Sequence, residues 1–207
     1  MALAFAEIAF TPAVRAQQER GGAGQYARFL SVERTGGDLL GEEERTFVEA
    51  RDGFYQATVS ETGWPYVQFR GGPRGFLRVL DPQTIAYADL RGNRQYISMG
   101  NLTVNDRISL ILMDYAAARR LKIWGRVRID GPEAAKAAGL VTTGGARVER
   151  MVRIHVAAFD WNCPSHIPRR LTVEEASGAW QALKRENAAL LAEVRALREA
   201  LAATGRG

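Results

Sequence analysis

The stretch IAYADLRGNRQYISMGNLTVN, residues 85–105, decides the fold, because a polar loop in it joins a strand-like run to a helix-like run. Residues 85–89 suit a strand, and residues 90–95 form a basic, polar loop. The first N–H groups of a helix lack partners within the helix and carry the positive end of its dipole. Together with arginine and asparagine side chains they can hold a phosphate. The alternative interpretation is a surface turn whose arginines are solvated.

Further strand-like runs surround this stretch and predict short antiparallel strands. Turn residues separate them at 61–63 and 81–83, where Gly63 and Pro82 suit tight turns. The expected strands cover residues 54–60, 65–71, 76–80, 84–89, 107–115, 120–130 and 150–160, and the expected short helices cover 42–51, 94–101 and 132–140. Few long helices separate the strands, so the pattern favours a barrel over a parallel βαβ sheet.

Three parts follow one another along the chain. Residues 1–40 are rich in Gly and Arg and predict an N-terminal arm of short helices and turns, and residues 41–171 form the barrel domain. Residues 172–204 form an amphipathic C-terminal helix that begins with a capping box from Thr172 to Glu175. Its heptads favour a parallel dimer zipper, with Asn187 at one a position. A helix lying on its own domain is the alternative.

Composition excludes several classes of protein. The 207 residues carry a formal net charge of +5, but the basic residues are scattered among acids, which argues against nucleic acid as a partner. No apolar run approaches the ~18–20 residues of a membrane span, and no basic region precedes the apolar residues at the start, so we expect neither a membrane partner nor a signal peptide. The single cysteine, Cys163, fits a reducing cytoplasm.

Several motifs resemble one known family. These are DGFY at 52–55, GWPYVQFRGGP at 63–73, GNRQYIS at 92–98, RLKIWG at 120–125 and DWNCPSHI at 160–167. They resemble the pyridoxamine 5′-phosphate oxidase-related, FMN-binding split-barrel family, and most of all its uncharacterised flavin-nucleotide-binding subgroup. From residue 52 to residue 167 the matching pieces span more than half of the chain, and they follow one another in the expected order.

The resemblance implies a mainly β fold, a six-stranded antiparallel split β-barrel of Greek-key type, and the sequence pattern adds peripheral helices and a long C-terminal helix to it. It also implies a homodimer that holds one FMN in each of two clefts at its interface. The implied cofactor-binding residues are Gln68, Arg70, Gly71, Asn93, Arg94, Gln95, Arg120 and Lys122, and the implied neighbours of the ring or substrate are Trp161, Asn162 and His166. FMN has a dianionic phosphate and a flat, partly apolar ring, and these residue types suit both.

The chain departs from the oxidase proper at two places. Asn93-Arg94-Gln95 replaces a Ser-Arg-Lys phosphate loop, and the C-terminal Arg-x-His substrate motif is not recognisable. Both departures argue against pyridoxal phosphate synthesis. A metal site is also disfavoured. Cys163 and His166 have a C-x-x-H spacing, but His155 is the only other histidine, and a zinc site needs at least three protein ligands.

Three functions remain open at the level of sequence. The preferred one is an FMN-dependent oxidoreductase acting on a small-molecule substrate or a redox partner, with catalytic residues that the sequence does not identify. The second is a flavin-binding electron carrier without turnover of its own, and the third is an interaction protein assembled by the zipper. Relatives of this fold also bind heme or deazaflavin, so the choice of FMN rests on the resemblance.

Overall fold

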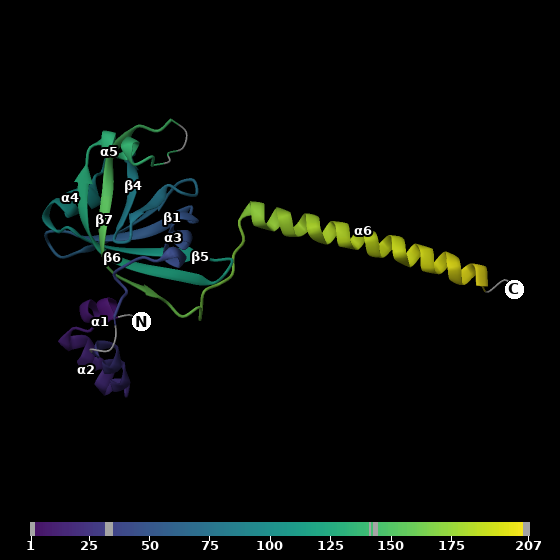
Figure 1. Cartoon of the computed structure of the whole chain (residues 1–207), viewed down its shortest axis with the longest axis horizontal. Helices are drawn as coiled ribbons and strands as arrows, with labels where there is room; N and C mark the ends of the chain where they lie inside the picture. The colour runs from purple at the N-terminus through teal and green to yellow at the C-terminus, as the bar shows by residue number, and fades with distance from the viewer. Residues whose placement is uncertain (1–2, 32–34, 141, 143–144, 205–207) are drawn as a thin grey trace. The chain divides into compact units, whose positions relative to one another are not determined.

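The computed structural model describes residues 3–31, 35–140, 142 and 145–204 (Figure 1). Its helices are α1 (Leu3–Ala9), α2 (Pro12–Arg20), the 3-10 helix η1 (Gly24–Leu30), α3 (Glu42–Glu49), α4 (Ile97–Val104), α5 (Pro132–Ala137) and α6 (Val173–Thr204). Its strands are β1 (Gly53–Val59), β2 (Pro65–Gly71), β3 (Leu77–Asp81), β4 (Thr84–Leu90), β5 (Arg107–Asp114), β6 (Arg119–Asp130) and β7 (Val148–Trp161). The chain divides into two compact units, residues up to 114 with 118–167, and residues 115–117 with those from 168 onward.

The strands form one antiparallel sheet in the order β2-β1-β5-β6-β7-β4-β3. Because β2 and β3 are the two ends of this order, the sheet formed by the described strands does not close on itself. Long connections bring β5 beside β1 and β7 beside β4. The predicted class is confirmed: a mainly β, antiparallel split barrel with peripheral helices and a long C-terminal helix.

The sheet has seven strands, which match the seven strand-like runs, whereas the resemblance implies six. One hydrophobic cluster of described residues fills the inside of the sheet, and every strand except β2 contributes to it. On its inner face β2 instead carries polar side chains, because Gln68 lies opposite the buried Gln56 and Arg70 lies opposite the buried Phe54. The polar inner face of β2 therefore borders the hydrophobic cluster without contributing to it.

Helix α4 begins at Ile97, three residues later than the predicted start at Arg94. The delay follows from the backbone, because Arg94 and Tyr96 have φ angles of 60° and 51°. Residues in this left-handed region cannot continue a right-handed helix, and it is uncommon for residues other than glycine. Nothing in a residue's identity as Arg or Tyr indicates such a conformation.

The N-terminal helix α1 packs on the outer face of β6 through an aromatic contact. The Phe5 ring is almost fully buried and stacks on Trp124 with a centroid distance of 4.6 Å. The Lys122 ammonium lies 4.4 Å from the centroid of the same ring. Phe5 therefore contacts both the cation and the indole of one strand.

Helix α6 begins with the predicted capping box. The Thr172 backbone N–H donates to Glu175 Oε2 at 2.8 Å, and the Glu175 N–H donates to Thr172 Oγ1 at 3.2 Å. This reciprocal pair satisfies two donors that would otherwise lack partners at the start of the helix.

None of the described helices has the length and apolar character that crossing a bilayer requires.

Candidate functional site

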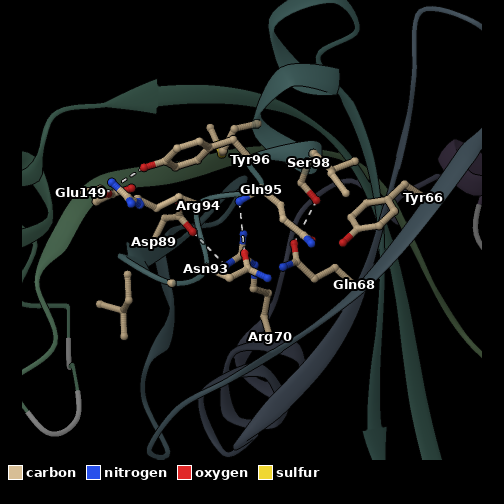
Figure 2. A pocket seen from close by; sticks show the side chains of 14 residues that line it. Tyr66, Gln68, Arg70, Asp89, Asn93, Arg94, Gln95, Tyr96, Ser98 and Glu149 are labelled. Atoms are coloured by element: carbon tan, nitrogen blue, oxygen red, sulfur yellow. Dashed lines mark hydrogen bonds and ion pairs between the residues drawn. The ribbon is translucent and has the colours of Figure 1, made fainter.

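A cavity of about 100 Å³ lies where β4 ends, beside β2 and the start of α4 (Figure 2). Polar side chains dominate its lining. The lining residues are Tyr66, Gln68, Arg70, Asp89, Leu90, Gly92, Asn93, Arg94, Gln95, Tyr96, Ile97, Ser98, Met99 and Glu149. The cavity is smaller than the ~300–1,000 Å³ of pockets that enclose whole small molecules, so it suits one polar group of a ligand.

The loop between β4 and α4 forms one wall of the cavity through its own hydrogen bonding. The Gln95 N–H donates to Asn93 Oδ1 at 3.2 Å, which closes an Asx turn. Left-handed residues at Arg94 and Tyr96 then turn the chain into α4. Since the first turn of α4 also lines the cavity, N–H groups without partners in the helix border it.

Asp89 connects two arginines beside the cavity. Its carboxylate, whose side chain is only 5% exposed, lies 2.9 Å from Arg70 Nη1 and 3.3 Å from Arg150 Nε. A buried carboxylate between two guanidinium groups has its charge compensated. The ion pair with Asp89 also holds the Arg70 side chain in position at the end of β2.

Glu149 is the second carboxylate of the lining, and it too is paired. It accepts hydrogen bonds from Arg150 Nη2 at 2.7 Å and from the Tyr96 hydroxyl at 3.1 Å. Desolvation alone would raise the pKa of the Glu149 carboxyl, but these hydrogen bonds and the charges of Arg150 and Arg91 outweigh it. The pKa of Glu149 therefore lies below its ordinary value, and the side chain is ionised at neutral pH.

Arg94 differs from the other arginines at the cavity. Arg70, Arg91 and Arg150 each pair with Asp89 or Glu149, whereas Arg94 makes no ion pair with any residue that the structure describes. Among the residues that the structure describes, two carboxylates thus face four guanidinium groups in and around the cavity. The excess of positive charge favours an anion as the ligand.

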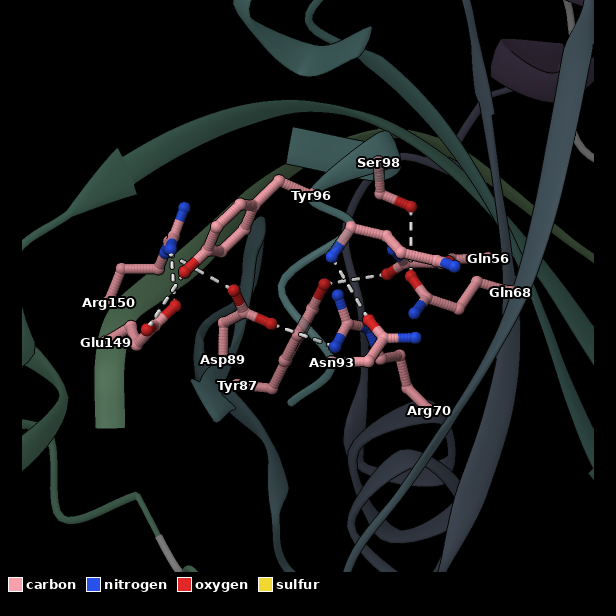
Figure 3. A network of polar contacts seen from close by, with 11 residues as sticks. Gln56, Gln68, Arg70, Tyr87, Asp89, Asn93, Tyr96, Ser98, Glu149 and Arg150 are labelled. Atoms are coloured by element: carbon pink, nitrogen blue, oxygen red, sulfur yellow. Dashed lines mark hydrogen bonds and ion pairs between the residues drawn. The ribbon is translucent and has the colours of Figure 1, made fainter. Parts of the chain in front are cut away.

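Buried and half-buried polar side chains continue from the cavity toward the barrel interior (Figure 3). The Ser98 hydroxyl donates to Gln68 Oε1 at 3.0 Å, and the Tyr87 hydroxyl donates to Gln56 Oε1 at 2.7 Å. Burial raises the pKa of the Tyr87 hydroxyl, which keeps it protonated and able to donate. Within the described part of the chain, Gln56 Nε2 is buried without a hydrogen-bond partner.

Five of the predicted cofactor residues line this one cavity: Gln68, Arg70, Asn93, Arg94 and Gln95. Gly71 lies next to it, in a neighbouring cavity of about 170 Å³ that shares Arg70 and Leu90 with the first. The following glycine has a packing role, because a Cβ on Gly72 would approach the Phe76 ring to 2.6 Å. The remaining predicted residues lie elsewhere.

Lys122 lies on the opposite face of the sheet from Arg70. Across the sheet it pairs with Ile111, and Ile111 pairs with Tyr55, both on the outer face. Arg70 pairs with the buried Phe54 on the inner face. Within one chain these two cations cannot reach the same ligand group. Lys122 instead forms an ion pair with Asp160, at 3.3 Å.

The predicted ring neighbours are spread over the end of β7 and the loop that follows. The Trp161 indole N–H donates to Glu44 of α3 at 2.8 Å, and its ring packs edge-on against Phe47. The Asn162 N–H donates to the Arg120 carbonyl at 3.2 Å, and His166 is exposed in the loop. Trp161 therefore closes one end of the barrel in this chain. Among the residues that the structure describes, no three His, Cys, Asp or Glu side chains gather to hold a metal ion.

A model of one protein family covers most of the barrel and the loop that builds this cavity. The model, described as pyridoxamine 5′-phosphate oxidase, matches residues 40–174, more than half of the chain. The chain belongs to the pyridoxamine 5′-phosphate oxidase family. Membership supports a flavin-binding or oxidoreductase-like function without fixing a specific activity. No curated protein matches the chain.

Several solved structures are similar to this member of the pyridoxamine 5′-phosphate oxidase family. HupZ from Group A Streptococcus has 21% identity and a TM-score of 0.46, and the match covers 58% of this chain and 92% of that one. A putative pyridoxamine 5′-phosphate oxidase from Lactobacillus delbrueckii has 17% identity and a TM-score of 0.47, over 59% and 94%. An FMN-binding protein from Syntrophomonas wolfei has 12% identity and a TM-score of 0.47, over 70% and 97%. At these values the similarities carry no functional assignment.

Sequence reasoning missed five polar residues at the cavity of this family member: Tyr66, Asp89, Tyr96, Ser98 and Glu149. Tyr66 could have been found, because it alternates with Gln68 and Arg70 along one strand and so shares their face. Ser98 could have been found as well, because it lies in the first helical turn after the polar loop of residues 90–95. Glu149 could not have been found from the sequence, because it lies on β7, more than fifty residues after the loop of residues 90–95.

Proposed function

We propose that this chain binds FMN as a homodimer and acts as an FMN-dependent oxidoreductase. Family membership supports a flavin, and the cavity at the β4–α4 loop is the observation that carries the proposal. Its ligand would be the terminal phosphate of FMN, which has a charge of about −2 near neutral pH. Arg94, as a cation without an ion pair among the described residues, is the first residue we expect to contact it.

The residues present fit a phosphate. Asn93, Gln95 and Ser98 bring hydrogen-bonding side chains to the cavity, and the first turn of α4 adds backbone N–H groups. Asp89 and Glu149 would repel an anion if their charges were uncompensated, but arginines pair with both. A cavity of about 100 Å³ fits one phosphate and cannot enclose the rest of the cofactor.

A second copy of the chain would complete the site. The outer faces of β1, β2 and β5 expose large apolar side chains, with exposed fractions of 42% for Tyr55, 58% for Phe69 and 39% for Ile111. These three residues are direct neighbours across the sheet. Such a contiguous apolar surface is typical of an interface. We assign it to the homodimer.

A dimer would also explain why the predicted cofactor-binding residues lie on two opposite faces of the sheet. Arg70 and Lys122 lie on opposite faces of one sheet, so one ligand could contact both only if they came from different copies. In this arrangement one chain binds the phosphate, and Arg120 and Lys122 of the second copy lie near the ring. Cations there would stabilise negative charge on the reduced flavin.

When bound, FMN supplies the transfer of hydride or single electrons. The protein binds the phosphate, orients the ring and provides positive charge. The substrate is a small molecule or a redox partner. The C-terminal Arg-x-His substrate motif is not recognisable, and Asn93-Arg94-Gln95 replaces Ser-Arg-Lys; together these departures argue against pyridoxamine phosphate as that substrate. The single cysteine supports a cytoplasmic location.

The absorption spectrum of the purified full chain tests the cofactor, and mass analysis of whatever dissociates on denaturation identifies it. We expect flavin bands and FMN. A colourless protein that does not bind added FMN would contradict the proposal. Flavin that neither NAD(P)H nor a reduced partner can reduce would instead make the protein a flavin-binding module without turnover.

Arg94→Ala tests the phosphate loop. Loss of one charged hydrogen bond should weaken FMN binding by about 1.5–3 kcal/mol, which is roughly 10- to 150-fold in the dissociation constant. Titration followed by flavin fluorescence measures this change. Arg128→Ala is the control, because Arg128 is 80% exposed and does not line the cavity. Equal affinities of the Arg94 variant and the unchanged protein would remove this loop from the site.

A further inference from the structure

We propose that α6 forms a parallel, two-stranded coiled coil with α6 of a second copy of this chain, a contact distinct from the apolar face of the barrel. The helix α6 (Figure 1) runs for 32 residues. Every side chain described in it is exposed. A single helix surrounded by water gains little stability from intrinsic helix propensity, and most helices depend on packing of an apolar face. An apolar stripe that is exposed along such a helix is therefore expected to pack against another surface.

The apolar side chains of α6 follow a heptad repeat. Trp180, Val194 and Leu201 occupy a positions, and Leu183, Leu190 and Leu197 occupy d positions. All six are between 42% and 75% exposed. Leu191, at an e position, borders this seam. The b, c and f positions carry alanines and polar or charged residues, so the apolar stripe is narrow, as in a coiled coil, and not the broader face of a helix packed on a domain.

Asn187 identifies the partner as an identical helix in the same direction. It occupies the a position between Trp180 and Val194, where it is exposed to solvent in the single chain. In a parallel, in-register pair a residues meet their own copies, so the two Asn187 amides can hydrogen-bond to each other. In an antiparallel pair Asn187 would meet an apolar d residue. A lone buried amide lacks a partner there and destabilises that pairing.

Charge complementarity supports the same choice. Glu193 at a g position would lie opposite Arg198 at the following e position of the second copy, as parallel pairing requires. Leucine at the successive d positions, together with the a-position Asn187, favours two strands over three or four. The occupant of the seam is thus α6 of another copy, in register.

Disulfide trapping in the full-length protein tests this pairing. In a Cys163→Ser background, Leu183→Cys and Leu197→Cys each place one thiol at a d position. The controls Ala182→Cys and Ala196→Cys place thiols one residue earlier, at c positions that face away from the seam. Mild oxidation followed by non-reducing electrophoresis measures the fraction of covalent dimer. We expect both d variants to be mostly cross-linked and both c variants to remain mostly single chains.

Each other outcome overturns the proposal. Cross-linking of only one d variant indicates antiparallel or shifted helices, because only a parallel, in-register pair brings both positions to their own copies. Equal cross-linking of the d and c variants indicates that the α6 helices of two copies meet at random. Absence of cross-linking in all four variants indicates that α6 packs on its own chain. The readout involves no flavin, so failure here is distinguishable from failure of the proposed FMN site.

A second measurement concerns Asn187. Replacing a polar a residue by leucine should raise the melting temperature of the helical signal by several degrees and broaden the distribution of oligomers. Circular dichroism and light scattering on full-length Asn187→Leu measure both. Ala188→Leu, one position further and outside the seam, should leave both unchanged. A similar response from the two variants would show that Asn187 is not part of the seam.

Discussion

Asp89 shows how single residues prepare the cavity for an anion. One buried carboxylate pairs with both Arg70 and Arg150, which come from strands far apart in the sequence. Two cations are thereby fixed beside the cavity while part of their charge is compensated. Arg94, which has no such carboxylate among the described residues, provides the charge that a ligand can use. One side chain thus orients the site, and in the proposed function the other contacts the ligand.

Glu149→Gln tests the paired carboxylate through pH. The folded pKa of Glu149 is lowered from 4.5, so its stabilising effect is present above about pH 4.5 and is lost as pH falls through the folded pKa. The variant should therefore unfold at lower urea than the unchanged protein at pH 7, and the difference should shrink toward pH 3. Urea unfolding at both pH values measures it. Glu61→Gln, in the exposed hairpin turn, is the control, and a difference that grows in acid would contradict this reading.

How far the site could be predicted depends on how close its residues are in sequence. Asn93, Arg94 and Gln95 are consecutive, so a strand–loop–helix pattern was enough to identify them as a group. Gln68 and Arg70 required the family resemblance. Glu149 lies on β7, and only the pairing of β7 with β4 brings it to the loop. Long-range strand pairing of this kind leaves no local signal.

At the scale of elements, β2 serves two surfaces at once. Its even-numbered residues Tyr66, Gln68 and Arg70 line the cavity, while Val67 and Phe69 on the other face are 61% and 58% exposed. Alternation of side chains along a strand allows this division. A ligand site and a proposed dimer surface therefore share one backbone, and the position of each depends on the other.

Phe5→Ala tests how firmly α1 is docked. Removing the ring that stacks on Trp124 should lower the free energy of unfolding by about 1.5–3 kcal/mol, the value of a buried phenylalanine. Urea unfolding followed by tryptophan fluorescence measures the loss. Ile8→Ala is the matched control, because Ile8 lies on the same helix and is 46% exposed. Equal losses for the two variants would mean that the stacked ring does not anchor the helix.

At the scale of the whole molecule, the strand pattern was the most predictable feature. Seven runs with turn residues between them became seven strands, since alternation and Gly or Pro turns are local properties. The left-handed residues before α4 were not predictable, because Arg and Tyr give no sign of a positive φ angle. The contact of Phe5 with Trp124 was not predictable either, because it joins segments far apart in the sequence. The capping box of α6 was predictable, because it needs only Thr172 and Glu175.

Ending the chain at residue 177 tests how much each proposed interface, the apolar barrel face and the α6 coiled coil, contributes to the stability of the dimer. The barrel face should still hold two copies together, so we expect a dimer with a larger dissociation constant. Sedimentation at several protein concentrations measures the change. Monomers at every concentration would show that α6 is the principal dimer contact and that the apolar barrel face is not an interface.

The place of β2 at the end of the strand order has a consequence for how the protein would lose a ligand. Among the described strands it pairs only with β1, so it can peel away while the other strands stay together. Its amides should exchange with deuterium sooner than those of β6, which is paired on both sides. Gln68 and Arg70 would leave with it, so mild denaturant should empty the cavity before the barrel melts.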